Sequence, residues 1–245
     1  MTAPRNPWIM TSSGRAFDLV EPTSAMVHWP DVAEQLAKTP RFAGATPGVH
    51  YSVAQHSVLV AQLVSPEWRP WALLHDAHEA WLGDDTTPKK AAVSHAAGAR
   101  CALEHGHRMR DLKDALREAL GEGSMAWSRA WPVLERTRIE PPDYAGAVKT
   151  AQEQMRRRID LAVWAAAGLG VPCDACQRAV KHADLVALST ERRDLMPKGI
   201  DAEWDIPLHE PDPKRIKPLP WPKAMILFQQ DMARTFPHLQ LRSAA

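Results

Sequence analysis

The chain has 245 residues, of which 45% are hydrophobic and 24% are charged, and its formal net charge is +1. These values are typical of a folded globular protein and exclude a largely disordered or fibrous chain. The near-neutral charge argues against a protein that depends on long DNA, because affinity for the DNA backbone comes from dense Lys and Arg. A small phosphorylated ligand needs only a few local cations and remains compatible with this composition.

Apolar residues recur at helical spacing along most of the chain, and alternating Val, Ile and Thr runs are scarce, so the sequence predicts an all-α fold. Ser52 and Gln55 have the spacing of a capping box at a helix start, Gly83 is a helix stop, and Thr87-Pro88 is a helix start. The expected helices cover residues 31–38, 52–65, 70–82, 87 with breaks towards 121, 143–169, 173–196 and 223–234.

We expect one domain over residues 1–245 and a homo-oligomer, either a dimer or a larger assembly. Seven prolines fall within 197–222. That density excludes a regular helix and favours an extended strap across the surface, followed by a final helix.

The chain is expected to be cytoplasmic and to have no membrane partner. Its three cysteines, Cys101, Cys173 and Cys176, are too few and odd in number for a disulfide framework. The N-terminus lacks the continuous apolar core of a signal peptide. The most apolar stretch, 159–171, is too short to cross a bilayer.

Four ionisable residues stand in otherwise apolar helical sequence and predict a metal site. Buried carboxylates cost several kcal/mol each unless they are paired or bind a metal. Two imidazoles and two carboxylates from three helices suit one divalent cation, such as Co²⁺, Mn²⁺, Mg²⁺ or Zn²⁺, and leave positions open for water and a substrate oxygen. The four residues are His56, His75, Asp76 and Asp184.

Further charged residues accompany these four. Glu79 follows His75 by four positions, so the two are expected to share one helix face. Asp84 comes directly after the Gly83 stop, at the mouth of the same site. Lys89 lies in the first turn of the next expected helix, where backbone N–H groups and the helix dipole attract anions.

The order of these motifs resembles the HD-domain metal-dependent phosphohydrolases, most closely their 5′-deoxynucleotidase branch and the phage dATP triphosphohydrolases. That branch has an Arg 15 residues before the first metal His, which here is Arg41. It also has the pattern His-Asp-x-x-Glu-x-x-x-Gly-Asp followed by Thr-Pro, which this chain shows over residues 75–88. The similarity covers about residues 10–90 and 175–236. The run between Asp84 and Asp184 is longer than in compact members of the family, so we expect an insertion at about 121–144 that covers the site or forms a subunit contact.

The resemblance implies a helical HD domain whose metal serves the hydrolysis of deoxynucleotides. It implies that Glu79 orients or deprotonates the attacking water, and that Asp84 contacts the sugar or assists the leaving oxygen. Arg41 and Lys89 would neutralise charge on the phosphate oxygens, and Phe42 would pack on the sugar.

The expected reaction converts a deoxynucleoside monophosphate into a deoxynucleoside and phosphate. A triphosphohydrolase that attacks the α-phosphate of a dNTP is the alternative, with Arg192 and Arg193 as additional cations. A second alternative is a non-catalytic nucleotide or nucleic-acid-binding protein that uses the 156–158 arginine cluster. The presence of Glu79 argues against it, because a sensor needs no acid–base group.

The sequence allows more than one interpretation of His78 and of the cysteine pair Cys173 and Cys176. His78 is expected to face solvent, in preference to a place beside the metal or in a second metal site. The pair Cys173 and Cys176, with His182 nearby, lacks an evident fourth ligand, so a helix start is favoured over a zinc site.

Overall fold

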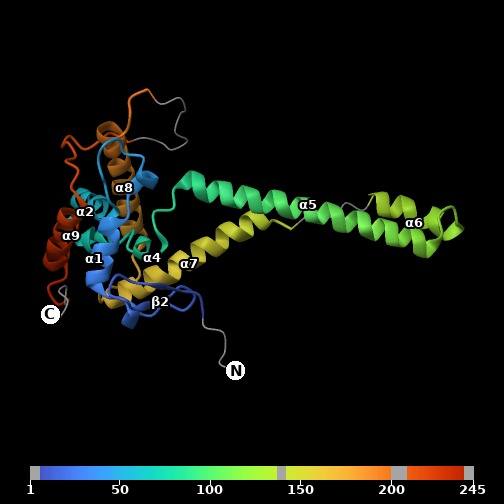
Figure 1. Ribbon diagram of the computed structural model, residues 1–245, viewed down its shortest axis with the longest axis horizontal. Helices are drawn as coiled ribbons and strands as arrows, with labels where there is room; N and C mark the ends of the chain where they lie inside the picture. The colour runs from blue at the N-terminus through green and yellow to red at the C-terminus, as the bar shows by residue number, and fades with distance from the viewer. Residues whose placement is uncertain (1–5, 137–141, 200–208, 240–245) are drawn as a thin grey trace. The chain divides into compact units, whose positions relative to one another are not determined.

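The computed structural model describes residues 6–136, 142–199 and 209–239, with side chains omitted at 134–136. The described chain is predominantly helical and has one small antiparallel sheet, which pairs β1 (Trp8–Met10) with β2 (Ala16–Asp18) (Figure 1). The predicted all-α class is therefore confirmed. The chain divides into two compact units: unit 1 is Met1–Thr86 with Gln154–Ala245, and unit 2 is Thr87–Glu153.

Unit 1 is built from helices that pack side by side around one core. Helix α2 contacts α3, α8 and α9, and α1 contacts α2, α4 and α9 (Figure 1). The helices are α1 (Trp29–Lys38), α2 (Val53–Leu63), α3 (Arg69–Leu73), α4 (Glu79–Leu82), the end of α7 (Tyr144–Ala166), α8 (Asp174–Leu195) and α9 (Trp221–Thr235). Short 3₁₀ turns lie at η1 (Ser24–Met26), η2 (Arg41–Gly44) and η3 (Pro66–Trp68).

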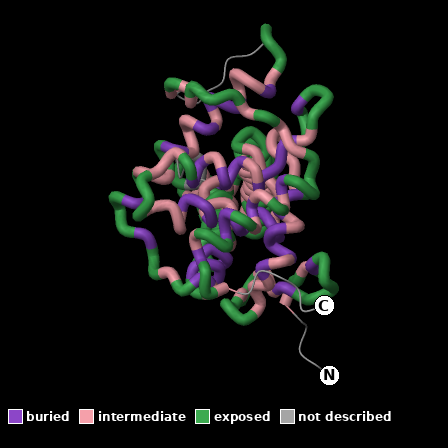
Figure 2. Tube along the Cα trace, turned by 90° about the vertical axis from the view of Figure 1, so that its left-hand side faces the viewer, coloured by how far each residue is buried: buried purple, intermediate pink, exposed green. Residues whose placement is uncertain are grey.

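The core of unit 1 joins segments that are far apart in the sequence. Phe17 of β2 stacks on Trp81 of α4, with ring centroids 3.9 Å apart. Ile159 and Val163 bring the last turns of α7 into the same apolar cluster. The buried stretches lie in the interior of this unit, and exposed residues follow its outer loops (Figure 2).

The start of α2 confirms half of the predicted capping box. The Ser52 hydroxyl accepts a hydrogen bond from the Gln55 N–H. The Gln55 side chain does not return to Ser52. Its amide instead donates to the Lys217 carbonyl and accepts from the Leu219 N–H, so it fixes the strap to α2.

The single helix expected over 70–82 is wrong, because the chain leaves helical geometry in the middle of it. Helix α3 ends at Leu73, residues 74–78 form turns, and α4 begins at Glu79. His75 and Glu79 therefore do not share one continuous helix face. The stop at Gly83 is confirmed, with φ of 76°, a left-handed conformation that glycine adopts without strain.

Unit 2 contains α5 (Thr87–Leu120), α6 (Met125–Arg136) and the first residues of α7. Helix α5 is continuous over 34 residues, without the expected breaks, and none of its residues is buried. It approaches α7 closely at Gly98, where an added Cβ would lie 3.2 Å from the Cβ of Ala145. The expected insertion at 121–144 lies within this unit, which begins earlier, at Thr87.

The described part of the strap, 209–220, has no regular structure, and α9 begins at Trp221, two residues before the expected start. Asp194 at the end of α8 fastens it. This carboxylate accepts a hydrogen bond from the Ile216 N–H at 2.8 Å and pairs with Arg193 and Arg215. Its side chain is almost fully enclosed, so the strap and α8 share one ionic anchor.

We predict that Asp194→Asn lowers the stability of the protein by about 1–3 kcal/mol at pH 7, the usual contribution of hydrogen bonds to a charged group. The hydrogen bonds from Arg193, Ile216 and Arg215 outweigh partial burial and hold the pKa of Asp194 well below its usual range. A lowered pKa means that the stabilisation is complete above about pH 5 and declines as the pH falls below about 4.

Chemical unfolding at pH 7 and pH 3 measures this difference. The gap between wild type and Asp194→Asn should narrow at pH 3, while the exposed strap carboxylate variant Glu210→Gln should match wild type at both values. An equal gap at both pH values would contradict an ionic anchor.

Candidate metal centre

The four residues predicted to bind metal come together in unit 1 from three segments. Helix α2 supplies His56, the turn after α3 supplies His75 and Asp76, and α8 supplies Asp184. Nε2 of His75 is 3.1 Å from Oδ2 of Asp76, and Nε2 of His56 is 3.5 Å from the same oxygen. Nε2 of His56 is also 3.3 Å from Oδ1 of Asp184. Ligand atoms of His56, His75 and Asp76 all lie within 4.8 Å of one another, so these three residues can hold a metal ion. Asp184 contacts His56 but does not belong to this group of three.

Both imidazoles are oriented by acceptors at Nδ1. His56 donates from Nδ1 to Glu191 Oε1 at 2.6 Å, and His75 donates from Nδ1 to the Ala72 carbonyl at 2.8 Å. In each neutral ring this leaves the Nε2 lone pair directed at carboxylate oxygens. Both Nε2 atoms are buried and lack a hydrogen-bond partner. Lone pairs facing carboxylates repel unless a cation or a proton lies between them, so the donor set fits a divalent metal.

In the metal-free protein, a proton on His56 takes over part of the role of a cation. Burial and Arg41 disfavour a charged His56, but Glu191 and Asp184 outweigh them and raise its pKa to about 10. Despite burial, the imidazoles hold the pKa of Asp76 and of Asp184 well below the usual range. A proton on His56 therefore partly neutralises the carboxylates of the metal-free protein.

Glu79 lies at the start of α4, beside the cluster, and is 8% exposed. Its Oε2 is buried and has no hydrogen-bond partner. Burial and the charges of Asp76 and Asp84 raise its pKa to about 10. The helix break changes the place of Glu79, because it is the first residue of α4 and does not share a helix with His75, which lies in the preceding turn.

Arg41 lies in η2 between two carboxylates. Its NH1 is 3.6 Å from Asp84 and its NH2 is 3.4 Å from Glu191, while its Nε is buried without a partner. Both contacts are longer than the 2.7–2.9 Å typical of charge-assisted hydrogen bonds. Glu191 and Asp76 outweigh the burial of the guanidinium and raise its pKa further above its usual value.

The loop after Arg41 has an unusual backbone. Phe42 and Ala43 have φ of 56° and 53°, in the left-handed region that non-glycine residues rarely adopt. The Phe42 N–H donates to Asp84 Oδ2 at 3.0 Å. Asp84 thus joins the loop to the metal-binding turn and also contacts the guanidinium of Arg41.

Sequence reasoning missed the role of Glu191. This carboxylate is fully buried in α8, contacts both His56 and Arg41, and keeps a lowered pKa because their charges outweigh its burial. Its signal was present: Glu191 follows Asp184 by seven positions, two turns along the same helix face.

The expectation that His78 faces solvent is wrong. Its residue is 7% exposed, and its Nδ1 donates to Oδ1 of Asp160 in α7 at 3.0 Å. The turns at 74–78 direct this side chain towards α7. Ligand atoms of Asp76, His78 and Glu79 form a second group that can hold a metal, all within 4.8 Å of one another.

Among the described residues, the remaining sequence candidates belong to neither of the groups that can hold a metal. Lys89 is exposed in the first turn of α5, in unit 2, and its contact with phosphate stays a prediction. Cys173 is the exposed N-cap of α8 and Cys176 is buried; among the described residues, neither belongs to a group able to hold a metal. The arginines 156–158 are exposed on α7.

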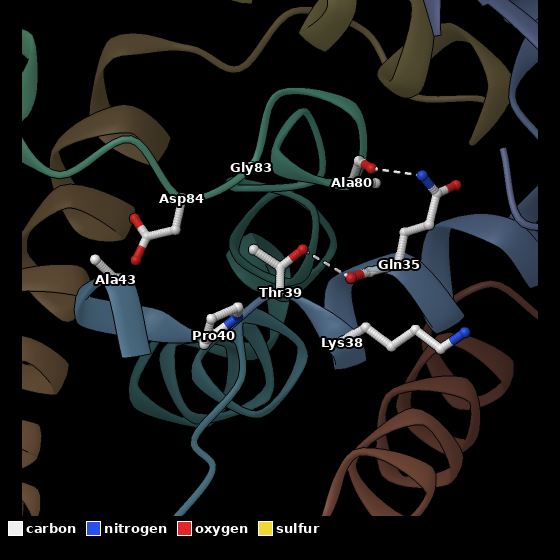
Figure 3. A pocket seen from close by; sticks show the side chains of 8 residues that line it. All are labelled: Gln35, Lys38, Thr39, Pro40, Ala43, Ala80, Gly83 and Asp84. Carbon is white, nitrogen blue, oxygen red and sulfur yellow. Dashed lines mark hydrogen bonds between the residues drawn. The ribbon is translucent and has the colours of Figure 1, made fainter. Parts of the chain in front are cut away.

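A pocket of about 460 Å³ lies beside Asp84 (Figure 3). Asp84 and Ala43 stand at one end, and Gln35 and Lys38 at the other (Figure 3). Thr39, Pro40, Ala80 and Gly83 complete the lining. The Gln35 amide donates to the Ala80 carbonyl at 2.8 Å, which fixes α1 against α4 at the pocket wall. Asp84 is the residue that the pocket shares with the charged cluster.

Comparison with known proteins gives two relatives, both named as uncharacterized proteins. The chain is 43% identical to RCAP_rcc00048 of Rhodobacter capsulatus over 97 residues, which cover 36% of this chain and 50% of that protein. It is 29% identical to YfdR of Escherichia coli K12 over 196 residues, which cover 79% of this chain and 74% of that protein. No family model matches the chain. The match therefore spans half the length of the first relative, and neither relative's name indicates a function.

Among the described helices, none combines the length and the apolar composition that a membrane crossing requires.

We predict that Glu191→Gln weakens metal binding about 10–100-fold, the usual effect of losing a partner that orients a ligand. The amide keeps the shape but removes the charge that fixes His56 with Nδ1 protonated. Titration of the metal-free protein with Co²⁺, followed by its absorption bands, measures the change. Asp31→Asn is the control, because Asp31 is also a buried carboxylate but its partners are Thr11, Ser12, Ser13 and His28. Unchanged Co²⁺ affinity in Glu191→Gln would refute an orienting role.

Proposed function

We propose that the chain is an HD-type, metal-dependent phosphohydrolase that converts deoxynucleoside monophosphates into deoxynucleosides and phosphate. The observation that carries the proposal is the convergence of His56, His75, Asp76 and Asp184 around unpartnered Nε2 atoms. Their order along the chain is that of the HD phosphohydrolases, and Arg41 lies beside them at the spacing of the deoxynucleotidase branch.

A divalent cation held by these four residues would polarise the phosphate and lower the pKa of a bound water. Glu79 then supplies the acid–base step. In the metal-free protein, burial and the charges of Asp76 and Asp84 keep Glu79 protonated. A cation on Asp76 offsets one of these charges, so Glu79 loses its proton more readily and can accept one from the attacking water.

Arg41 suits the phosphate of the substrate. Its guanidinium has five N–H donors, and its two carboxylate contacts are long, so it retains donors for phosphate oxygens. The pocket beside Asp84 offers space for the nucleoside, with Phe42 at the loop next to it. Contact of Asp84 with the sugar remains part of this proposal.

The triphosphohydrolase alternative needs more cations for the longer phosphate chain. Arg193, one of the two arginines expected to supply them, is engaged elsewhere. Its guanidinium pairs with Asp194 and donates to the Asp212 and Lys214 carbonyls of the strap. This engagement favours the monophosphate reaction. The expected homo-oligomer and cytoplasmic location stay predictions.

Glu79→Gln should lower turnover about 100-fold or more, because the amide keeps the shape but cannot accept a proton. Phosphate release is measured over all dNMPs, NMPs and dNTPs with Mn²⁺, Co²⁺, Mg²⁺ and Zn²⁺. Wild type should release phosphate from dNMPs, and the variant should still bind metal tightly at His56 and His75. Release of triphosphate from dNTPs would support the alternative, and no hydrolysis of any nucleotide would refute the proposal.

Arg41→Ala should raise KM for dNMPs and lower kcat/KM, and Arg41→Lys should be intermediate because it keeps the charge but loses the planar fork. Both variants should keep metal affinity and melting temperature close to wild type. Arg69→Lys is the matched control, since Arg69 pairs with buried Asp231 away from the cluster. Wild-type kinetics in Arg41→Ala would exclude the phosphate role.

A further inference from the structure

We propose that unit 1 binds a second divalent cation, beside the first, through Asp76, His78 and Glu79. Ligand atoms of these three residues lie within 4.8 Å of one another. They also come from one short segment, the turns between α3 and α4 and the first residue of α4. The helix break at 74–78 brings His78 to the other two, because an uninterrupted helix would place residues 76 and 79 on one face and turn residue 78 to another.

The hydrogen bond at Nδ1 of His78 is the kind that orients metal-binding histidines in proteins. Its Nδ1 donates to the Asp160 carboxylate, which fixes the tautomer and leaves the lone pair on Nε2. The same arrangement holds His56, whose Nδ1 donates to Glu191. The cluster therefore contains two imidazoles held by buried carboxylates from other helices, and the first metal group uses only one of them.

The buried, unpartnered oxygen of Glu79 is an independent observation that points to a bound cation. Its side chain is more than nine-tenths buried, and Oε2 has no hydrogen-bond partner. Burying an unpaired carboxylate oxygen is unfavourable, and neither the fold nor the first metal group supplies a donor for it. A cation between Glu79 and Asp76 would satisfy this oxygen and separate the two carboxylates.

Asp76 belongs to both groups and can serve both ions. Its Oδ2 is the oxygen that faces His75 and His56, and a carboxylate has a second oxygen to offer. The five carboxylates around the cluster also outnumber the permanent cations that pair with them, since Arg41 faces Asp84 and Glu191, and Lys181 pairs with Asp184. Two carboxylates and one imidazole suit Mn²⁺ or Mg²⁺ better than a thiol-seeking metal.

This inference rests on the proposed function in one respect, because it changes how Glu79 acts. With a second ion present, Glu79 would act on the water through that ion and not by direct contact. Paired ions also fit phosphate hydrolysis, in which both the attacking and the leaving oxygen develop charge.

Equilibrium dialysis of chelator-treated full-length protein against Mn²⁺ tests the second site. Wild type should bind two Mn²⁺ per chain, and His78→Ala should bind one, with the remaining affinity unchanged. Asp160→Asn should weaken the second Mn²⁺ about 10–100-fold and leave the first in place. His238→Ala is the control, because this imidazole bonds to the Ala167 carbonyl and contacts the Phe236 ring, and the variant should still bind two Mn²⁺.

A single Mn²⁺ in wild type, or two in His78→Ala with unchanged affinity, would overturn the second site. If His78→Ala does not fold, the Mn²⁺ count, Mn²⁺ affinities and melting temperature of Asp160→Asn decide whether the second site exists. If the contact between His78 and Asp160 serves only to join α7 to the turn, Asp160→Asn would lower the melting temperature without changing the Mn²⁺ count or affinities. That result would also overturn the proposal. Two bound Mn²⁺ without nucleotide hydrolysis would refute the proposed function and keep the second site.

Discussion

The contact between Glu191 and His56 is the interaction on which the candidate centre depends. Both side chains are completely buried, and each would be unfavourable without the other. The pair joins α8 to α2, fixes the tautomer of the imidazole, and sets one of the two charges that hold Arg41. The Glu191 carboxylate thus helps to position His56, a candidate metal ligand, and Arg41, a candidate for binding substrate. Glu191 itself is neither a candidate ligand nor a candidate substrate contact.

Much of the fold and the choice of candidate metal ligands followed from local sequence. His56 and Asp184 are charged or titratable residues on apolar helix faces, a pattern that a single sequence displays directly. The break at 74–78 did not follow, because its local sequence has ordinary helical character and the turn is closed by the hydrogen bond between His75 and the Ala72 carbonyl. The burial of His78 was equally hidden, since its partner Asp160 lies 82 positions further along the chain.

The cluster is organised around a deficit of positive charge. In the metal-free protein, protons on His56 and Glu79 compensate for it, as the raised pKa values of both groups show. A metal that binds here would have to displace these protons, so the affinity for a cation should rise with pH. The same coupling links the acid–base character of Glu79 to the occupancy of the neighbouring ligands.

The backbone at Phe42 and Ala43 has a consequence for how this site can vary. Two successive non-glycine residues in the left-handed region store strain of about 1–3 kcal/mol each, and the Phe42 N–H bond to Asp84 is one of the contacts that hold them there. Asp84 therefore stabilises the conformation of this loop in addition to contributing a negative charge. A descendant chain that lost this carboxylate would keep the position of Arg41 most easily by acquiring glycine at 42 or 43, so the identities of these three positions should change together over evolutionary time.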